Sequence, residues 1–176
     1  MQRIPAPLPS AARWLGVGGL VIFVALAIWR VRTPSGSAFV HVALVGYGAT
    51  ILTFIGALHW GFAMMMPRTS RTDQWRLMGW SVIPALAGWS AMLLPVGLDI
   101  GVLLAVYWVH YGLDVHLAQS RAIPHWYLPL RTVLTLGATL SLLAVLVLTS
   151  GPVDPHFWMP QSGPPPVSAP SPGQSF

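Results

Sequence analysis

Long apolar stretches dominate the sequence, and short segments rich in arginine, proline and glycine separate them. A transmembrane helix needs about 20 mostly apolar residues, and five stretches approach or exceed that length. They are residues 14–29, 39–66, 77–94, 96–117 and 128–149. This pattern predicts an all-α polytopic membrane protein, built as a bundle of five transmembrane helices.

The rest of the chain predicts little additional folded structure. Residues 1–13 form an N-terminal segment, residues 14–150 the five-helix domain, and residues 151–176 a Pro-rich extended tail. Short connections make neighbouring helices antiparallel. The first apolar stretch ends in Trp29-Arg30-Val31-Arg32 rather than in a small-x-small cleavage site, so we expect it to be retained as a span.

The composition narrows the class of function. Hydrophobic residues make up 55% of the chain and charged residues 7%, whereas soluble domains carry about 25% charged residues. This balance argues against a soluble enzyme and against nucleic-acid binding. Cysteine, lysine and glutamate are missing from the sequence, which removes thiolate and Schiff-base chemistry. We therefore predict no catalytic residue and favour a non-enzymatic role.

The arginines predict the orientation in the membrane. With five spans, one side of the membrane holds seven of them and the other side holds two, Arg30 and Arg32. The seven are Arg3, Arg13, Arg68, Arg71, Arg76, Arg121 and Arg131. Positive charge favours the cytoplasmic side. We expect a bacterial inner (cytoplasmic) membrane protein with a cytoplasmic N-terminus and a periplasmic C-terminus.

Several polar residues fall within the spans at one predicted depth, near the cytoplasmic side. They are His59, His110, Asp114 and Arg131. Ionisable groups inside a membrane are costly and mark candidate sites. The favoured interpretation is an Asp114–Arg131 ion pair with His59 nearby, which locks helices together. A proton relay, a small-molecule site, or a metal site formed by His110, Asp114 and His116 remain alternatives.

Histidine spacing also raises the question of a cofactor. His41 and His59 are on one face of the second span at different depths. Two stacked haems would need this spacing of histidines on the second span and again on a facing helix. His110 and His116 on the fourth span do not mirror it. We predict no cofactor and no metal ion, and keep haem or quinone as open alternatives.

The tail contains eight prolines and little that could pack into a core. Its apolar cluster of Phe157, Trp158 and Met159 is flanked by Pro155 and Pro160. Such a cluster suits the membrane interface or a groove on a neighbouring protein. We predict that it contacts another subunit.

Two motifs in the spans resemble a known family. The first is Tyr47-Gly48-Ala49, Ile51-Leu52, Phe54-Ile55-Gly56 and His59-Trp60-Gly61. The second is Asp114 followed by Pro124-x-Trp126-Tyr127-x-x-Leu130-Arg131-x-x-Leu134-Thr135. Together they resemble the DUF3429 family over about residues 40–146. The resemblance implies a small five-helix inner-membrane protein of bacterial or mitochondrial type, supplies no reaction, and adds Trp126 and Tyr127 to the polar cluster.

These observations predict a non-catalytic accessory, structural or assembly subunit of a larger inner-membrane complex. We expect an electron-transfer complex, respiratory or photosynthetic. The alternative is a binder or carrier of a small ligand such as quinone, lipid or a tetrapyrrole. An enzyme that uses the layer of His59 and Asp114 is less favoured. The expected partners are the lipid bilayer and other membrane-protein subunits.

Overall fold

The computed structural model describes residues 9–33, 38–65, 70–119 and 123–149. These residues form five α-helices and no strands. The helices are α1 (Ser10–Arg32), α2 (Ala38–Met65), α3 (Arg71–Ala91), α4 (Leu98–Gln119) and α5 (Tyr127–Leu148). The predicted all-α class is confirmed. By length and composition, four of the helices, α1, α2, α4 and α5, can cross a membrane, and the chain is a membrane protein.

Helix α3 begins earlier than the predicted span at residue 77. Ser70 caps it, because the Ser70 hydroxyl oxygen accepts a 3.1 Å hydrogen bond from the backbone N–H of Asp73. The same hydroxyl donates to the Asp73 carboxylate at 2.6 Å. This reciprocal cap lets a polar turn from Arg71 to Arg76 precede the apolar part of the helix.

Glycine allows α2 and α3 to pack closely. A Cβ atom on Gly56 of α2 would lie 2.6 Å from the backbone oxygen of Ser81 and 3.3 Å from the side chain of Pro84. A Cβ on Gly88 of α3 would lie 3.1 Å from Cα of Ala49. Pro84 is buried inside α3 and packs against this contact. Small residues at these positions therefore set the distance between the two helices.

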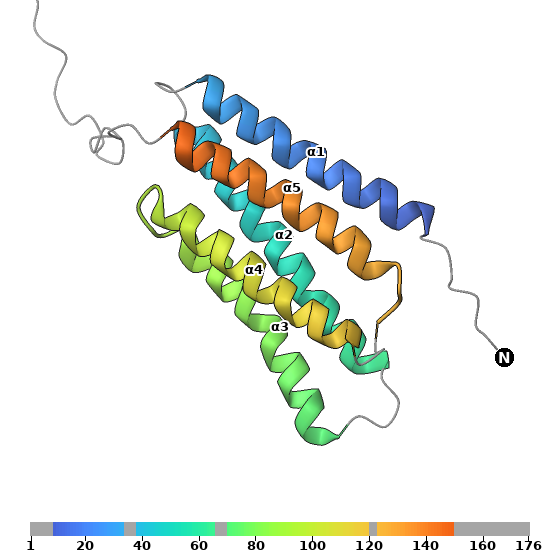
Figure 1. Ribbon diagram of the computed structural model, residues 1–176. Coiled ribbons are helices and arrows are strands. Elements are labelled where there is room, and N and C mark those ends of the chain that lie inside the picture. Colours follow the sequence, from blue (N-terminus) through green and yellow to red (C-terminus); the bar gives the residue numbers. More distant parts are fainter. Residues whose placement is uncertain (1–8, 34–37, 66–69, 120–122, 150–176) are drawn as a thin grey trace, which may run out of the picture.

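The five helices lie side by side, with α1 at one edge of the bundle and α3 at the other (Figure 1). Helix α1 packs on α5 and α2, while α3 packs on α2 and α4. The turn between α3 and α4 contains Gly97, whose φ of 95° is in the left-handed region that favours glycine. Because α2 contacts each of its neighbours α1, α3 and α4, it occupies the centre of the bundle.

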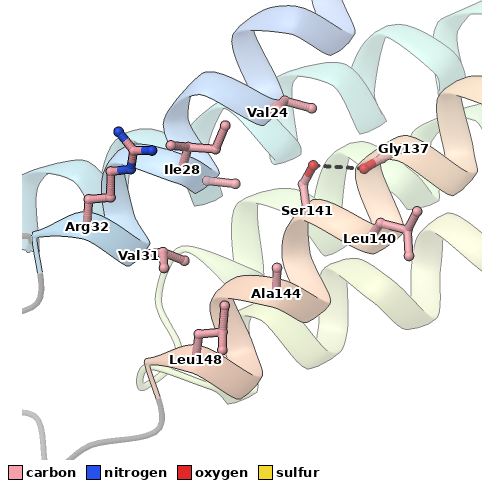
Figure 2. A pocket seen from close by; sticks show the side chains of 10 residues that line it. Val24, Ile28, Val31, Arg32, Gly137, Leu140, Ser141, Ala144 and Leu148 are labelled. Carbon is pink, nitrogen blue, oxygen red and sulfur yellow. Dashed lines mark hydrogen bonds between the residues drawn. The ribbon is translucent and has the colours of Figure 1, made fainter.

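The contact between α1 and α5 is tight at one end and open at the other. Leu20 packs against Gly137, where an added Cβ would come within 2.6 Å of the leucine side chain. Beyond that point the helices border a cavity of about 520 Å³ (Figure 2). Its walls are apolar apart from Arg32 and Ser141, and the Ser141 hydroxyl donates to the Gly137 carbonyl at 2.8 Å.

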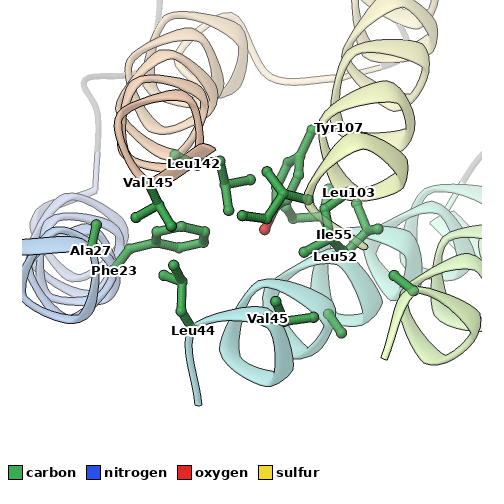
Figure 3. Packing of buried hydrophobic residues seen from close by; sticks show 14 residues of the cluster. Phe23, Ala27, Leu44, Val45, Leu52, Ile55, Leu103, Tyr107, Leu142 and Val145 are labelled. Carbon is green, nitrogen blue, oxygen red and sulfur yellow. The ribbon is translucent and has the colours of Figure 1, made fainter. Parts of the chain in front are cut away.

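The apolar core lies where α1, α2, α4 and α5 converge (Figure 3). Phe23 of α1 inserts toward Leu44, Leu142 and Val145, and all four side chains are buried. Tyr107 of α4 is 1% exposed, and its hydroxyl donates to the backbone carbonyl of Gly48 at 2.9 Å. The core thus joins α1, α2, α4 and α5, and Ala91 of α3 is also part of it.

The Pro-rich tail, residues 151–176, lies outside the described residues. The same is true of its cluster of Phe157, Trp158 and Met159. The predicted contact between this cluster and another subunit therefore stays a prediction.

Candidate functional site: a buried polar network

Five polar side chains from three helices meet inside the bundle, and we call them the polar network. They are His59 of α2, His110 and Asp114 of α4, and Tyr127 and Arg131 of α5. None is more than 8% exposed, and His110 and Asp114 are at 0%. Asp114 follows His110 by one helical turn, so both point in the same direction from α4.

The carboxylate of Asp114 is the centre of the network. Its Oδ2 atom accepts a 2.8 Å hydrogen bond from Nε of Arg131 and a 3.3 Å hydrogen bond from the Tyr127 hydroxyl. Nη1 of Arg131 donates to the hydroxyl of Thr135 at 2.9 Å. The ion pair anticipated from topology is therefore present, and it ties α4 to α5 inside the bundle.

His59 brings α2 to the same carboxylate. Its Nε2 atom lies 3.6 Å from Oδ1 of Asp114, a close approach that is longer than a normal hydrogen bond. The His59 ring also makes an edge-to-face contact with the ring of His110, with centroids 4.6 Å apart. Phe62 packs against both His59 and Tyr127 and separates the network from its surroundings on that side.

Trp80 of α3 adds a fourth helix, which sequence reasoning missed. Its indole N–H donates to Nδ1 of His110 at 3.1 Å. An indole can only donate, so Nδ1 is the acceptor and Nε2 carries the hydrogen of the neutral imidazole. Tryptophans are common in any membrane protein, and only the packing of α3 against α4 distinguishes Trp80 from the others.

Two of the predicted residues lie at the margin of the network. Trp126 is half-buried just before α5, and its ring contacts that of Tyr127 at a centroid distance of 6.4 Å. It thus borders the network through Tyr127. His116 is exposed to the outside of the bundle. The alternative metal site of His110, Asp114 and His116 is therefore wrong with respect to His116. The histidine that lies beside His110 and Asp114 is His59.

His59, His110 and Asp114 could geometrically approach a common metal ion, since one ligand atom of each lies within 4.8 Å of the others. The chemistry of these donors argues against it. Nε2 of His110 bears hydrogen as long as Trp80 occupies Nδ1. Arg131 already neutralises the carboxylate, so a divalent cation would add uncompensated charge to a buried site. Both ring nitrogens of His59, Nε2 of His110 and Oδ1 of Asp114 have no hydrogen-bond partner among the described residues, so the hydrogen on His110 and the charge of Arg131 are what oppose a metal ion here.

The second carboxylate–histidine pair lies at the opposite end of the bundle. His41 Nε2 lies 2.5 Å from Oδ2 of Asp99, and the other carboxylate oxygen accepts from the backbone N–H groups of Gly97 and Ile100. Asp99 thus holds the start of α4 and binds α2 there. His41 and His59 each face a carboxylate of α4, an arrangement that does not present two opposed histidines to a haem.

Comparison with known proteins supports a common family. The profile of a family described as a protein of unknown function, DUF3429, matches residues 8–147. Transmembrane protein 69 of Xenopus tropicalis is 34% identical over 148 residues, which is 84% of this chain and 57% of the relative. Transmembrane protein 69 of Mus musculus is 29% identical over 140 residues, 80% of this chain and 57% of the relative. The chain thus aligns with little more than half the length of these relatives, and no solved structure matches it significantly.

Proposed function

The chain belongs to the DUF3429 family, and from that premise we propose that it is a non-catalytic accessory subunit with a structural or assembly role in a larger membrane complex. The enclosure of the polar network is the observation that carries this proposal. Asp114 is fully buried and already paired with Arg131. A carboxylate held in this way stabilises helix contacts and is poorly placed to exchange protons with a substrate.

The network connects helices in a manner suited to a scaffold. Asp114 contacts α5 through Arg131 and lies against α2 through His59. His110 extends the connection to α3 through Trp80. One polar centre therefore fixes the relative positions of four helices, which supports a role in presenting a rigid outer surface to other subunits.

An exposed stripe along α3 offers such a surface. Trp75, Val82, Leu86 and Trp89 are exposed by 71%, 46%, 59% and 62%. Gly79 lies between them, and a Cβ atom there would meet nothing within 4 Å. Alternating spacings of four and three residues place these positions on one helix face. A small residue within such a stripe permits the close approach of a partner helix.

Two further parts of the proposal rest on the sequence. An electron-transfer complex is the expected class of partner, and the tail with Phe157, Trp158 and Met159 is the expected second contact. The orientation in a bacterial inner membrane, N-terminus in the cytoplasm, is supported by the distribution of the arginines.

Cross-linking in native membranes tests the proposal directly, because the chain has no cysteine of its own. The variant Gly79→Cys, which places a thiol on the α3 stripe, should form a cross-link to another membrane subunit. Gly101→Cys on α4 is the matched control, since it is also an exposed glycine with nothing within 4 Å of an added Cβ. Mild-detergent purification should recover the same partner in fixed ratio.

Deletion of residues 151–176 then tests the tail. We expect the truncated protein to remain inserted and folded but to lose part of the partner during purification. Recovery of the full-length chain alone, together with equal cross-linking from positions 79 and 101, would contradict the proposed subunit role.

A further inference from the structure

The cavity between α1 and α5 is an open groove with mostly apolar walls. Its lining comprises Val24, Ala27, Ile28, Val31 and Arg32 on α1, and Gly137, Leu140, Ser141, Ala144 and Leu148 on α5. The side chains in Figure 2 show apolar groups along the groove, with the Arg32 guanidinium beside Ile28 near the end of α1. The one hydroxyl in the lining is already bonded to the Gly137 carbonyl.

The dimensions of the groove match one leaflet of a bilayer. From Val24 to Arg32 the helix rises about 12 Å, and from Gly137 to Leu148 about 16 Å, at roughly 1.5 Å per residue. Half of a hydrocarbon core is about 15 Å thick. A groove that starts near the ends of two membrane helices and extends this far has the length of one extended acyl chain in a single leaflet.

The size of the groove suits a lipid chain. The cavity measures about 520 Å³, which is within the range of small-ligand pockets.

The charge at the mouth of the groove favours an anionic headgroup. Arg32 is the single charged residue in the lining, and it has no carboxylate partner among the described residues. Arg30, in the same last turn of α1, is 6% exposed and has Nε and Nη1 atoms without a hydrogen-bond partner there. Within the described part of the chain, two guanidinium groups without acidic partners thus lie in the last turn of α1, and of the two only Arg32 is exposed and lines the groove.

We propose that the α1–α5 groove binds an anionic phospholipid, with one acyl chain between the two helices and the phosphate on the guanidinium of Arg32. The groove is on the opposite edge of the bundle from the α3 stripe (Figure 1). Lipid binding here is therefore independent of the proposed subunit role.

Native mass spectrometry of the full-length protein tests this, with phosphatidylglycerol and a diacylglycerol of the same chains as probes. We expect phosphatidylglycerol to remain bound and Arg32→Gln to lower its occupancy about fivefold, the effect of one arginine at a lipid surface. Ala144→Phe, which fills the groove and leaves the charge, should lower binding of both probes. Arg13→Gln, at the other end of α1, is the matched control and should have no effect.

Three outcomes would overturn the proposal. Equal retention of phosphatidylglycerol and diacylglycerol would exclude the phosphate contact. Equal losses in Arg32→Gln and Arg13→Gln would show a general effect of charge on α1. Unchanged binding in Ala144→Phe, with the variant shown to be monodisperse, would place the lipid outside the groove.

Discussion

Nε of Arg131 lies 2.8 Å from Oδ2 of Asp114, and both side chains are buried, at 4% and 0% exposure. Neither charge can be solvated by water inside the bundle. Removal of one partner leaves the other charge unpaired in a low-dielectric site, whereas removal of both leaves none. The stability of the bundle should therefore depend on the pair more than on either residue.

We predict that Asp114→Asn and Arg131→Gln each lower the free energy of unfolding by about 3–5 kcal/mol. The double variant should be less destabilised than the sum of the two single variants, as measured by denaturant unfolding in detergent micelles. Arg76→Gln is the control, because its 3.9 Å contact with Asp73 is exposed and should contribute little. Additive effects of the two buried substitutions would show that the pair does not act as a unit.

Metal ions should not stabilise the polar network. Trp80 donates to Nδ1 of His110, which leaves the hydrogen of the neutral ring on Nε2, and Arg131 neutralises Asp114. A divalent cation therefore finds neither an unprotonated, unoccupied nitrogen on that imidazole nor an uncompensated negative charge. We expect the Tm of purified protein to be unchanged by a chelator and by added Zn²⁺, measured by differential scanning fluorimetry. A rise in Tm with Zn²⁺ that disappears in His59→Phe would instead identify a metal site.

Gly56 should be intolerant of even a methyl group. Its added Cβ would lie 2.6 Å from the Ser81 backbone oxygen, which cannot rotate away. Gly56→Ala should therefore cost about 1–3 kcal/mol of stability by forcing α2 and α3 apart. Gly61→Ala, on the same helix with nothing within 4 Å, should be neutral or gain up to about 1 kcal/mol from helix propensity. Similar behaviour of both variants in thermal unfolding would contradict the close packing.

Reporter fusions in a bacterial host check the orientation. A reporter active only in the periplasm should be active when it is fused after Ser150, because seven arginines on the other side favour the cytoplasm. The same reporter fused after Gln119, at the end of α4, should be inactive. The opposite pattern would reverse the assigned sides of the membrane.

Most of the helical framework follows from the sequence, because about 20 apolar residues in lipid have few alternatives to a helix. The start of α3 did not, since the Ser70 cap extends the helix into a polar turn that hydropathy excludes. The length of an apolar stretch indicates which residues lie in lipid, whereas the residue at which a helix begins depends on local hydrogen bonding.

The centre of the polar network could also be predicted from the sequence. Asp114 and Arg131 are rare charges within apolar spans, and antiparallel order puts them at one depth. The part played by Trp80 could not be predicted from the sequence, because an indole in the middle of α3 carries no charge that would indicate its partner. Its role depends on the angle at which α3 packs on α4, which residue types alone do not specify.

The pairing of Asp114 with Arg131 also constrains how the protein is made. Asp114 precedes Arg131 by 17 positions. During synthesis α4 therefore reaches the insertion machinery before Arg131, whose charge neutralises the Asp114 carboxylate. An aspartate costs about 2.5–3.5 kcal/mol to insert at the centre of a lone span, and less toward the span end where Asp114 lies. Helices α4 and α5 should consequently enter the lipid together as a hairpin, and a chain truncated after Gln119 should insert α4 less efficiently than a chain that includes α5.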